Sequence, residues 1–142
     1  MERFKVLFTF LVFLFFYSCA DKGTLRQAGD KELTIQLANI SDKEVNNDIS
    51  YAARITPAKR LFTAAGKSAK ENLMYRMDSC FYLQKGGTKV YAQLTQQVAN
   101  GLSGTFEYLV TFDTVNFDEH KWSFIYQDKY LNKRKYTLKL TD

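Results

Sequence analysis

Few side chains in this 142-residue chain have the chemistry that covalent catalysis requires. Serine and cysteine hydrolases combine a nucleophile with a base and with a group that orients the base. His120 is the only histidine, it lies in the polar run 118–121, and no serine lies in a G-x-S-x-G turn. Cys80 could pair with His120, yet a free cysteine usually serves as a small buried apolar residue. We therefore predict that Cys80 is buried, that His120 is a surface residue and that the chain is not an enzyme.

Oxygen-bearing side chains gather between residues 113 and 119. Calcium prefers about six to eight oxygen ligands, and this segment offers several, from Asp113, Asn116, Asp118 and Glu119. The glycine and the spacing of an EF-hand loop are missing, and Asp and Asn are common in turns because their side chains bond the local backbone. We therefore expect a turn and keep these four residues as the calcium candidates. A single histidine does not favour zinc, and no motif indicates a cofactor.

Tyrosine and basic side chains interleave near the C-terminus. Aromatic and arginine side chains are enriched where proteins bind partners. The pattern predicts a partner-binding face made of Tyr126, Tyr130, Lys133 and Arg134. The alternative is a plain strand, with Tyr136 in the core and the neighbouring lysines in solvent.

The N-terminal segment has the layout of an export signal. Arg3 and Lys5 form a positive head, residues 6–17 are mostly apolar, and Ser18 precedes Cys19. An apolar run of this length fits a signal peptide, whereas a membrane-spanning helix needs about 20 apolar residues. The segment resembles a bacterial lipoprotein signal peptide. Its lipobox departs from the usual pattern in having aromatic residues at 16 and 17, and its phenylalanine-rich run resembles the lipoprotein signals of the Bacteroidota.

This resemblance implies a location for the protein. Cleavage before Cys19 would make this cysteine the lipidated first residue of the mature chain, and two or more acyl chains anchor a protein stably. Ala20, rather than aspartate, follows the cysteine, which by resemblance to lipoprotein sorting favours the outer membrane. A membrane is therefore an expected partner and nucleic acid is not. Secretion without lipid and an uncleaved anchor stay open.

The chain divides into three parts. Residues 1–18 are the signal peptide, residues 19–31 are the lipidated cysteine with a charged, glycine-containing tether, and residues 32–142 are one domain. The net charge of +5 is mild. Lipidation of Cys19 would leave Cys80 without a disulfide partner, so the core alone must hold the domain together.

Apolar residues beyond the tether recur mostly at every second position, which is the period of a half-buried strand. Gly86-Gly87 and Asn100-Gly101 mark turns between such runs. The predicted fold is a single antiparallel, all-β sandwich of about seven strands, of the immunoglobulin-like type. The strand runs are 33–37, 49–55, 73–83, 90–98, 106–112, 122–126 and 136–140.

One segment departs from this period. Thr56 could cap a helix, Pro57 suits a first helical position, and Gly66 suits the position just past a helix end. We predict a short helix at 57–65 that crosses between the sheets.

The sequence predicts a class of function but no particular reaction. Small sandwiches bind partners through sheet edges and loops. We therefore favour a lipid-anchored, non-catalytic binding or assembly protein of the cell envelope, with another protein as partner. A periplasmic inhibitor or immunity lipoprotein is the alternative, and it would use the acidic 113–119 loop. A small hydrolase is the third hypothesis.

Overall fold

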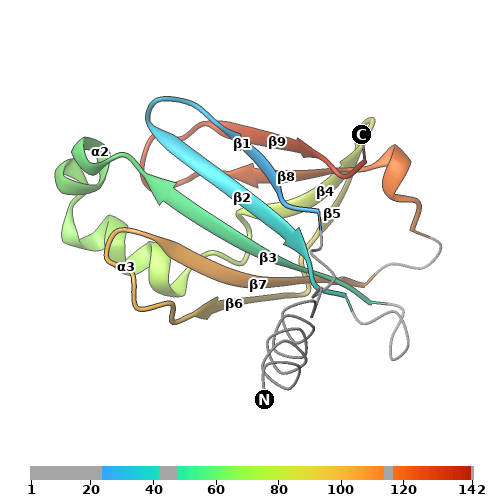
Figure 1. Ribbon diagram of the computed structural model, residues 1–142, viewed down its shortest axis with the longest axis horizontal. Helices are drawn as coiled ribbons and strands as arrows, with labels where there is room; N and C mark the ends of the chain where they lie inside the picture. The colour runs from blue at the N-terminus through green and yellow to red at the C-terminus, as the bar shows by residue number, and fades with distance from the viewer. Residues whose placement is uncertain (1–23, 42–47, 114–116, 142) are drawn as a thin grey trace, which may run out of the picture.

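The described part of the chain contains nine strands in two antiparallel sheets that face one another (Figure 1). The computed structural model describes residues 24–41, 48–113 and 117–141. The first sheet has the order β1-β2-β3-β7-β6, and the second has the order β5-β4-β8-β9. The bounds are β1 (Arg26–Gly29), β2 (Leu33–Asn39), β3 (Asp48–Pro57), β4 (Phe81–Lys85), β5 (Thr88–Tyr91), β6 (Leu94–Val98), β7 (Phe106–Asp113), β8 (Ser123–Gln127) and β9 (Lys135–Lys139). The predicted all-β sandwich is confirmed.

Alternation along the strands separates the core from solvent. In β2 the side chains of Leu33, Ile35 and Leu37 are buried, and the residues between them are partly exposed. The β2–β3 register places Ile35 opposite Ile55, another fully buried residue, so neighbouring strands present one continuous apolar face. Each fully buried side chain of this size contributes roughly 1.5–3 kcal/mol relative to an exposed one. The inner faces of the two sheets thus form the core.

The segment at 90–98 forms two strands rather than the single strand predicted. The backbone N–H of Ala92 donates to Phe81 in β4 at 3.3 Å, and the N–H of Gln93 donates to Thr111 in β7 at 2.9 Å. Two successive amides therefore bond to different sheets. The alternation of apolar residues continues through this crossover, which explains why the periodicity predicted one strand.

Two helices connect β3 to β4, where one was predicted. Helix α2 (Lys59–Ala64) lies inside the predicted 57–65 segment, but Pro57 still belongs to β3 and Ala58 occupies the cap position. Helix α3 (Lys67–Tyr75) replaces the first part of the strand predicted at 73–83. Leu73 and Met77 lie four residues apart and are buried, whereas Tyr75 is 74% exposed. The spacing of four, rather than the shared parity with Tyr75, was the informative signal.

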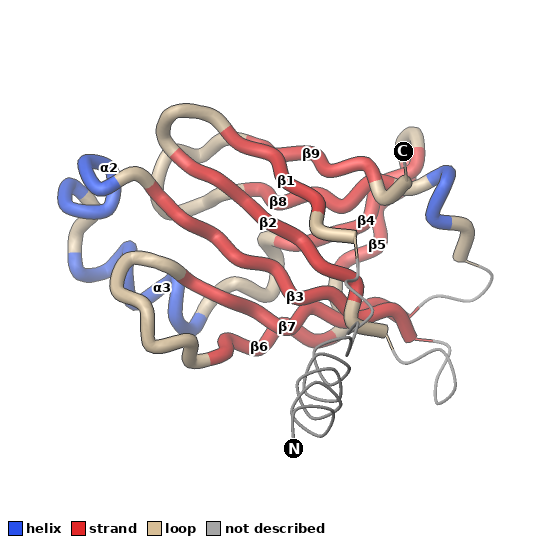
Figure 2. The backbone as a smooth tube through the Cα atoms, in the orientation of Figure 1, coloured by secondary structure: helices blue, strands red, loops and turns tan. Residues whose placement is uncertain are grey.

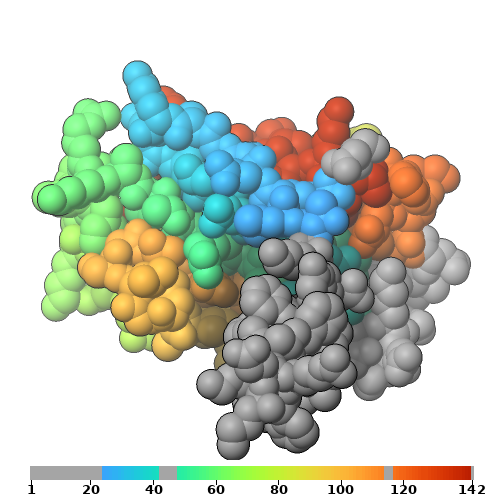
Figure 3. Space-filling view, in the orientation of Figure 1, coloured from blue at the N-terminus to red at the C-terminus, as the bar shows by residue number. Residues whose placement is uncertain are grey.

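Two further predictions need correction. The predicted tether at 19–31 contains β1, whose four residues pair antiparallel with β2, so the folded domain begins before residue 32. The strand order also differs from that of an immunoglobulin sandwich, because β1, β2 and β3 are consecutive neighbours in one sheet. β1 and β9 lie side by side where the two sheets meet along one edge (Figure 3).

The two ends of the sandwich differ. Figure 2 shows α2 and α3 gathered at one end, which also carries the β1–β2 turn at residues 30–32 and the β8–β9 turn at residues 128–134; we call it the helical end. At the opposite end lie the starts of β1 and β3, the end of β2 and the 3₁₀ helix η2 (Glu119–Lys121). We call it the pocket end. Within the residues described, no helix has the length and apolarity needed to cross a membrane.

Candidate functional site

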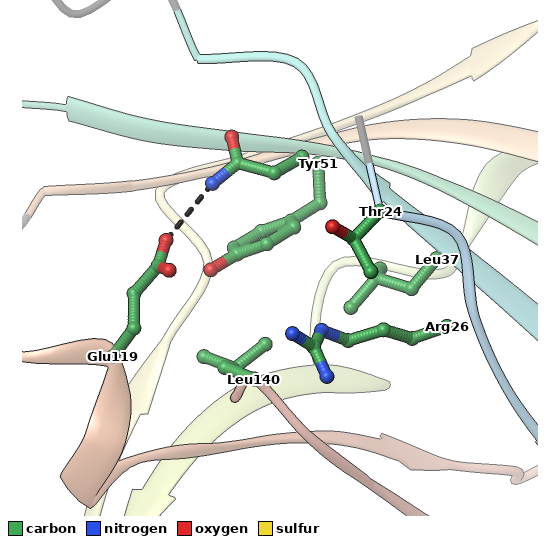
Figure 4. A pocket seen from close by; sticks show the side chains of 7 residues that line it. Thr24, Arg26, Leu37, Tyr51, Glu119 and Leu140 are labelled. Atoms are coloured by element: carbon green, nitrogen blue, oxygen red, sulfur yellow. Dashed lines mark hydrogen bonds between the residues drawn. The ribbon is translucent and has the colours of Figure 1, made fainter. Parts of the chain in front are cut away.

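A cavity of about 150 Å³ lies at the pocket end of the sandwich (Figure 4). Its walls combine two opposite charges, polar groups and two leucines. The lining residues are Thr24, Arg26, Leu37, Asn39, Tyr51, Glu119 and Leu140. This is well above the space that a single water molecule needs.

Strand register brings the cavity residues together. Arg26 of β1 lies opposite Leu37 of β2, and Asn39 of β2 lies opposite Tyr51 of β3. Side chains paired directly across a ladder share a face of the sheet, and Leu37 and Tyr51 are buried in the core. Arg26 and Asn39 therefore occupy inner-face positions at the end of the sheet, where the apolar core stops.

The most unusual feature of the cavity is the hydroxyl group of Tyr51. The residue is 2% exposed, and its hydroxyl has no hydrogen-bond partner among the described residues. Its ring is fixed by edge contacts with Phe112 and Phe124, at centroid distances of 6.3 and 5.5 Å. Burial raises the pKa of this phenol, the negative charge of Glu119 raises it further, and the positive charge of Arg26 opposes the shift. Tyr51 is thus a neutral, fixed donor.

An unpartnered buried hydroxyl is costly. Leaving a buried donor unsatisfied costs about 1–3 kcal/mol, and most buried polar groups in folded proteins are hydrogen-bonded. The other such group in the described part of the chain is the hydroxyl of Thr95 in β6, which does not line the cavity. A ligand in the cavity would give the Tyr51 hydroxyl a partner.

Glu119 is held in place at the cavity wall. The amide Nδ2 of Asn39 donates to Glu119 Oε1 at 2.9 Å. The η2 turn that carries Glu119 is capped by Asp118, whose Oδ1 accepts from the backbone N–H of His120 at 3.1 Å. Figure 4 shows Glu119 and Arg26 on opposite sides of the cavity, with the Tyr51 hydroxyl pointing inward. The cavity wall therefore combines a positive side chain, a carboxylate held by Asn39 and the neutral Tyr51 hydroxyl.

The calcium candidates do not form a cluster in the described residues. Asp113 is exposed at the end of β7, and Asp118 pairs with Lys121 at 3.2 Å and caps η2. Glu119 contacts Asn39 in the cavity, and Asn116 lies outside the described residues. No group of three or more potential metal ligands occurs within residues 24–41, 48–113 and 117–141. The predicted turn at Asp118 is present, and it serves to position Glu119.

The predicted partner-binding face is largely structural. Tyr126 is fully buried, so its inclusion was wrong: as an inner-face residue of β8 it stacks on Tyr136 at 6.1 Å. The hydroxyl of Tyr130 donates to the backbone oxygen of Arg76 at 2.7 Å. Arg134 pairs with Asp30 at 2.8 Å and joins the two turns of the helical end. Lys133 is exposed, and it has a left-handed backbone with φ of 60°.

Asp128 explains this arrangement. It is 1% exposed, and its carboxylate accepts the Tyr126 hydroxyl at 2.8 Å. The same carboxylate accepts backbone N–H groups across the turn, from Leu131 at 3.0 Å, Asn132 at 2.6 Å and Lys133 at 2.7 Å. One buried side chain therefore organises the turn in which sequence analysis placed a binding face.

Cys80 is buried, as predicted. It is 0% exposed within the core cluster, and burial raises the pKa of its thiol to about 11. His120 is exposed, also as predicted. The thiol is therefore sealed from solvent and protonated near neutral pH.

Sequence analysis missed Arg26, Asn39 and Tyr51. Arg26 stood in a segment interpreted as a tether, and Tyr51 had the inward parity of an ordinary core residue. The available signal was the pair of polar residues, Asn39 and Tyr51, at inward positions of two strands that run into polar loops. A polar group at an inward position near a strand end is a candidate pocket residue.

Comparisons with protein-family models, with curated proteins and with solved structures gave no match for this chain.

Proposed function

We propose that this chain is a lipid-anchored, non-catalytic binding protein of the bacterial cell envelope, held at the outer membrane by Cys19 and binding another envelope component at its pocket end. The observation that carries the proposal is that residues lining the cavity lie close in sequence to Cys19. Thr24 and Arg26 line it, and four residues separate Cys19 from Thr24. A fully extended chain spans at most about 3.6 Å per residue, so Cys19 lies within about 18 Å of Thr24. The pocket end stays close to any membrane that holds Cys19.

The chemistry of the described residues supports binding rather than catalysis. The Cys80 thiol is buried and its pKa is raised to about 11, so little thiolate forms near pH 7. Glu119 is the only carboxylate among the described residues that line the cavity, whereas a glycosidase typically uses two. Fixed charges and an unpartnered donor are instead features of a preformed ligand site.

The inhibitor alternative has less support. It would use the acidic 113–119 loop, but the Asp118 carboxylate caps η2 and pairs with Lys121, and Glu119 lies in the cavity wall. Asp113 is then the one acidic side chain of this loop's described residues that stays outside these contacts. An inhibitor that inserts an acidic loop into an enzyme would need these carboxylates to project outward.

The anchoring half of the proposal is tested by comparing two cysteine variants. Cys19→Ser and Cys80→Ala are each expressed as the full chain in a host that processes lipoproteins. We expect the wild type and Cys80→Ala to incorporate labelled palmitate and to sediment with outer membranes, and Cys19→Ser to do neither. Palmitate labelling of Cys19→Ser would contradict lipidation at this residue.

The binding half is tested by cross-linking in the native envelope, with the adducts identified by mass spectrometry. Glu119→Gln removes the cavity carboxylate. Glu107→Gln is the matched control, because this glutamate pairs with Arg54 at 3.1 Å on the outer face of the first sheet. We expect adducts to be lost in Glu119→Gln and kept in Glu107→Gln. Equal recovery from both variants would place the binding site elsewhere.

A further inference from the structure

Strand β6 is an open edge of the first sheet. It pairs with β7 on one side, and on the other side it pairs with no strand of the described residues (Figure 1). Leu94 and Val98 in this strand are 45% and 43% exposed, and Gln96 between them is also exposed. Four of the eight large apolar side chains that are exposed in the described part of the chain lie between residues 91 and 102. The edge is therefore accessible and partly apolar.

The other strands at sheet edges carry charges that discourage pairing with another chain. Unpaired backbone N–H and C=O groups along an edge can bond to a further strand, and charged side chains, lysine above all, commonly prevent this. β9 carries Lys135 and Lys139, β5 carries Lys89, and β1 carries a basic residue and lies against β9. Residues 92–105, which contain β6, include no charged side chain. Of the four edge strands described, β6 is thus the one that lacks a charge.

The charge of the whole chain limits where a second copy could approach. The net charge is +5, so two copies repel one another wherever their basic residues face each other. This repulsion is weakest at β6, which has no charge of its own. Glu107, which lies opposite Val98 in β7, already pairs with Arg54 at 3.1 Å. The uncharged edge is therefore suited to a contact between two like-charged molecules.

The sequence of β6 is also self-complementary in an antiparallel pairing. A two-fold axis at Gln96 would place Leu94 of one copy opposite Val98 of the second copy, and each Gln96 opposite its counterpart. Positions 94, 96 and 98 share one face of the strand, so the apolar side chains would meet each other and the two amides would meet at the axis. A symmetric dimer requires this kind of match between a surface and itself.

We propose that two copies of this chain associate through their β6 edges, so that their first sheets join into one continuous antiparallel sheet centred on Gln96. The two-fold axis of such a joined sheet is perpendicular to it, and both copies turn the same face of the sheet to the same side. Two chains anchored in one membrane can adopt this arrangement. The pairing itself depends on neither the cavity nor Cys19.

The register is tested with single added cysteines in the purified full chain, in a neutral detergent under mild oxidation. Gln96→Cys should form a disulfide between two copies, because directly opposite Cα atoms lie about 4.5–5.5 Å apart, within the range of a disulfide. Leu94→Cys is the matched control in the same strand. It should not cross-link to itself, because its counterpart lies four residues away along the ladder, at about 13 Å. The wild type gives the background from Cys19 and Cys80, and mass spectrometry locates each disulfide.

A mixture of two variants completes this test. Leu94→Cys mixed with Val98→Cys should give a disulfide between positions 94 and 98, because the register places these positions opposite one another. Equal cross-linking of Gln96→Cys and Leu94→Cys would overturn the proposed pairing. The absence of a disulfide from both Gln96→Cys and the mixture would also overturn it.

The second experiment measures association without cross-linking, by sedimentation velocity of the full chain in the same detergent. The wild type should form dimers in a concentration-dependent way. Gln96→Lys would place two ammonium groups opposite one another at the axis, and we expect it to weaken the dimer about fivefold or more. The control Thr88→Lys adds the same charge at an exposed position of the edge strand β5 and should associate as the wild type does. Equal weakening by both variants would overturn the assignment to β6.

A different occupant of the edge would also be recognised. A wild type that stays monomeric at every concentration would overturn the proposal. In the native envelope, a disulfide from Gln96→Cys to another protein, with none between copies, would assign the edge to that protein and would overturn self-association. Both lysine variants lie at exposed positions, so their melting temperatures should stay close to that of the wild-type monomer.

Discussion

The helical end and the pocket end of the sandwich each contain a buried tyrosine, and the hydroxyl groups of these two tyrosines are in different environments. Tyr108 of β7 and Tyr51 of β3 are both buried tyrosines of the first sheet. The Tyr108 hydroxyl donates to the backbone oxygen of Leu73 in α3 at 2.6 Å, whereas the Tyr51 hydroxyl has no partner in the described residues. The Tyr108 hydroxyl thus holds helix α3 against the end of the core. The Tyr51 hydroxyl retains its capacity to bond a ligand.

Polar contacts at the helical end fix the β8–β9 turn and link segments that are far apart in sequence. Asp128 binds the backbone of its own turn, Arg134 pairs with Asp30, and Tyr130 reaches the backbone of Arg76. At the pocket end, by contrast, the Tyr51 hydroxyl has no partner among the described residues. The polar groups at the helical end thus serve the fold, whereas the Tyr51 hydroxyl at the pocket end contributes no hydrogen bond to it in the described residues.

Loss of Asp128 should have the largest effect on stability. Asp128→Ala would leave the Tyr126 hydroxyl and several turn amides without their buried acceptor, so we expect the free energy of unfolding to fall by about 3 kcal/mol. Urea unfolding measures this change. The control Asp113→Ala, at an exposed position, should stay within about 0.5 kcal/mol of the wild type. A similar decrease in the free energy of unfolding in the two variants would contradict the role assigned to Asp128.

The Cys80 thiol should react slowly, because the core at the helical end covers it. With a pKa raised to about 11, from the 9.0 of an ordinary cysteine, the thiolate fraction at pH 8 falls about a hundredfold, and burial slows access further. Alkylation by iodoacetamide, followed by mass spectrometry, should modify Cys80 only in unfolding concentrations of urea. Rapid labelling of the native protein would mean that this part of the core opens readily.

Paired tyrosine variants give the sharpest test of the difference between the ends. Tyr108→Phe would leave the Leu73 carbonyl unsatisfied in the core and should lower the free energy of unfolding by about 1–2 kcal/mol. Tyr51→Phe should be neutral or stabilising, because it removes a buried hydroxyl that has no partner. Equal destabilisation by both changes, measured by urea unfolding, would show that Tyr51 also has a structural partner.

A smaller effect is expected from acid at the helical end. The hydrogen bond from Arg134, together with backbone N–H donors, lowers the pKa of Asp30 to about 2. An unfolded aspartate has a pKa near 4, so the ionised Asp30 contributes stability above pH 4, and this contribution is lost as the pH falls through about 2. The wild type should therefore melt above Asp30→Asn at pH 6 and close to it at pH 2. A constant gap over this range would contradict the role of the Asp30 charge.

The sequence alone determined the local structure wherever one period dominated. Leu33, Ile35 and Leu37 repeat at a spacing of two and form β2, and Gly86 with φ of 55° makes the predicted turn between β4 and β5. The burial of Cys80 followed from residue type, because free cysteines are usually buried. These predictions depend on neighbours within a few residues, for which propensity and periodicity are sufficient.

The tertiary structure alone decided which residues meet. The crossover at Ala92–Gln93 depends on two sheets competing for successive amides, and no local pattern records it. The burial of Tyr126 depends on Asp128 accepting its hydroxyl. Above all, the cavity joins Arg26, Tyr51 and Glu119, which are far apart in sequence and come together only through the β1–β2–β3 register and the position of η2. A site assembled across sheets is specified by long-range pairing, and side-chain spacing along the chain does not encode that pairing.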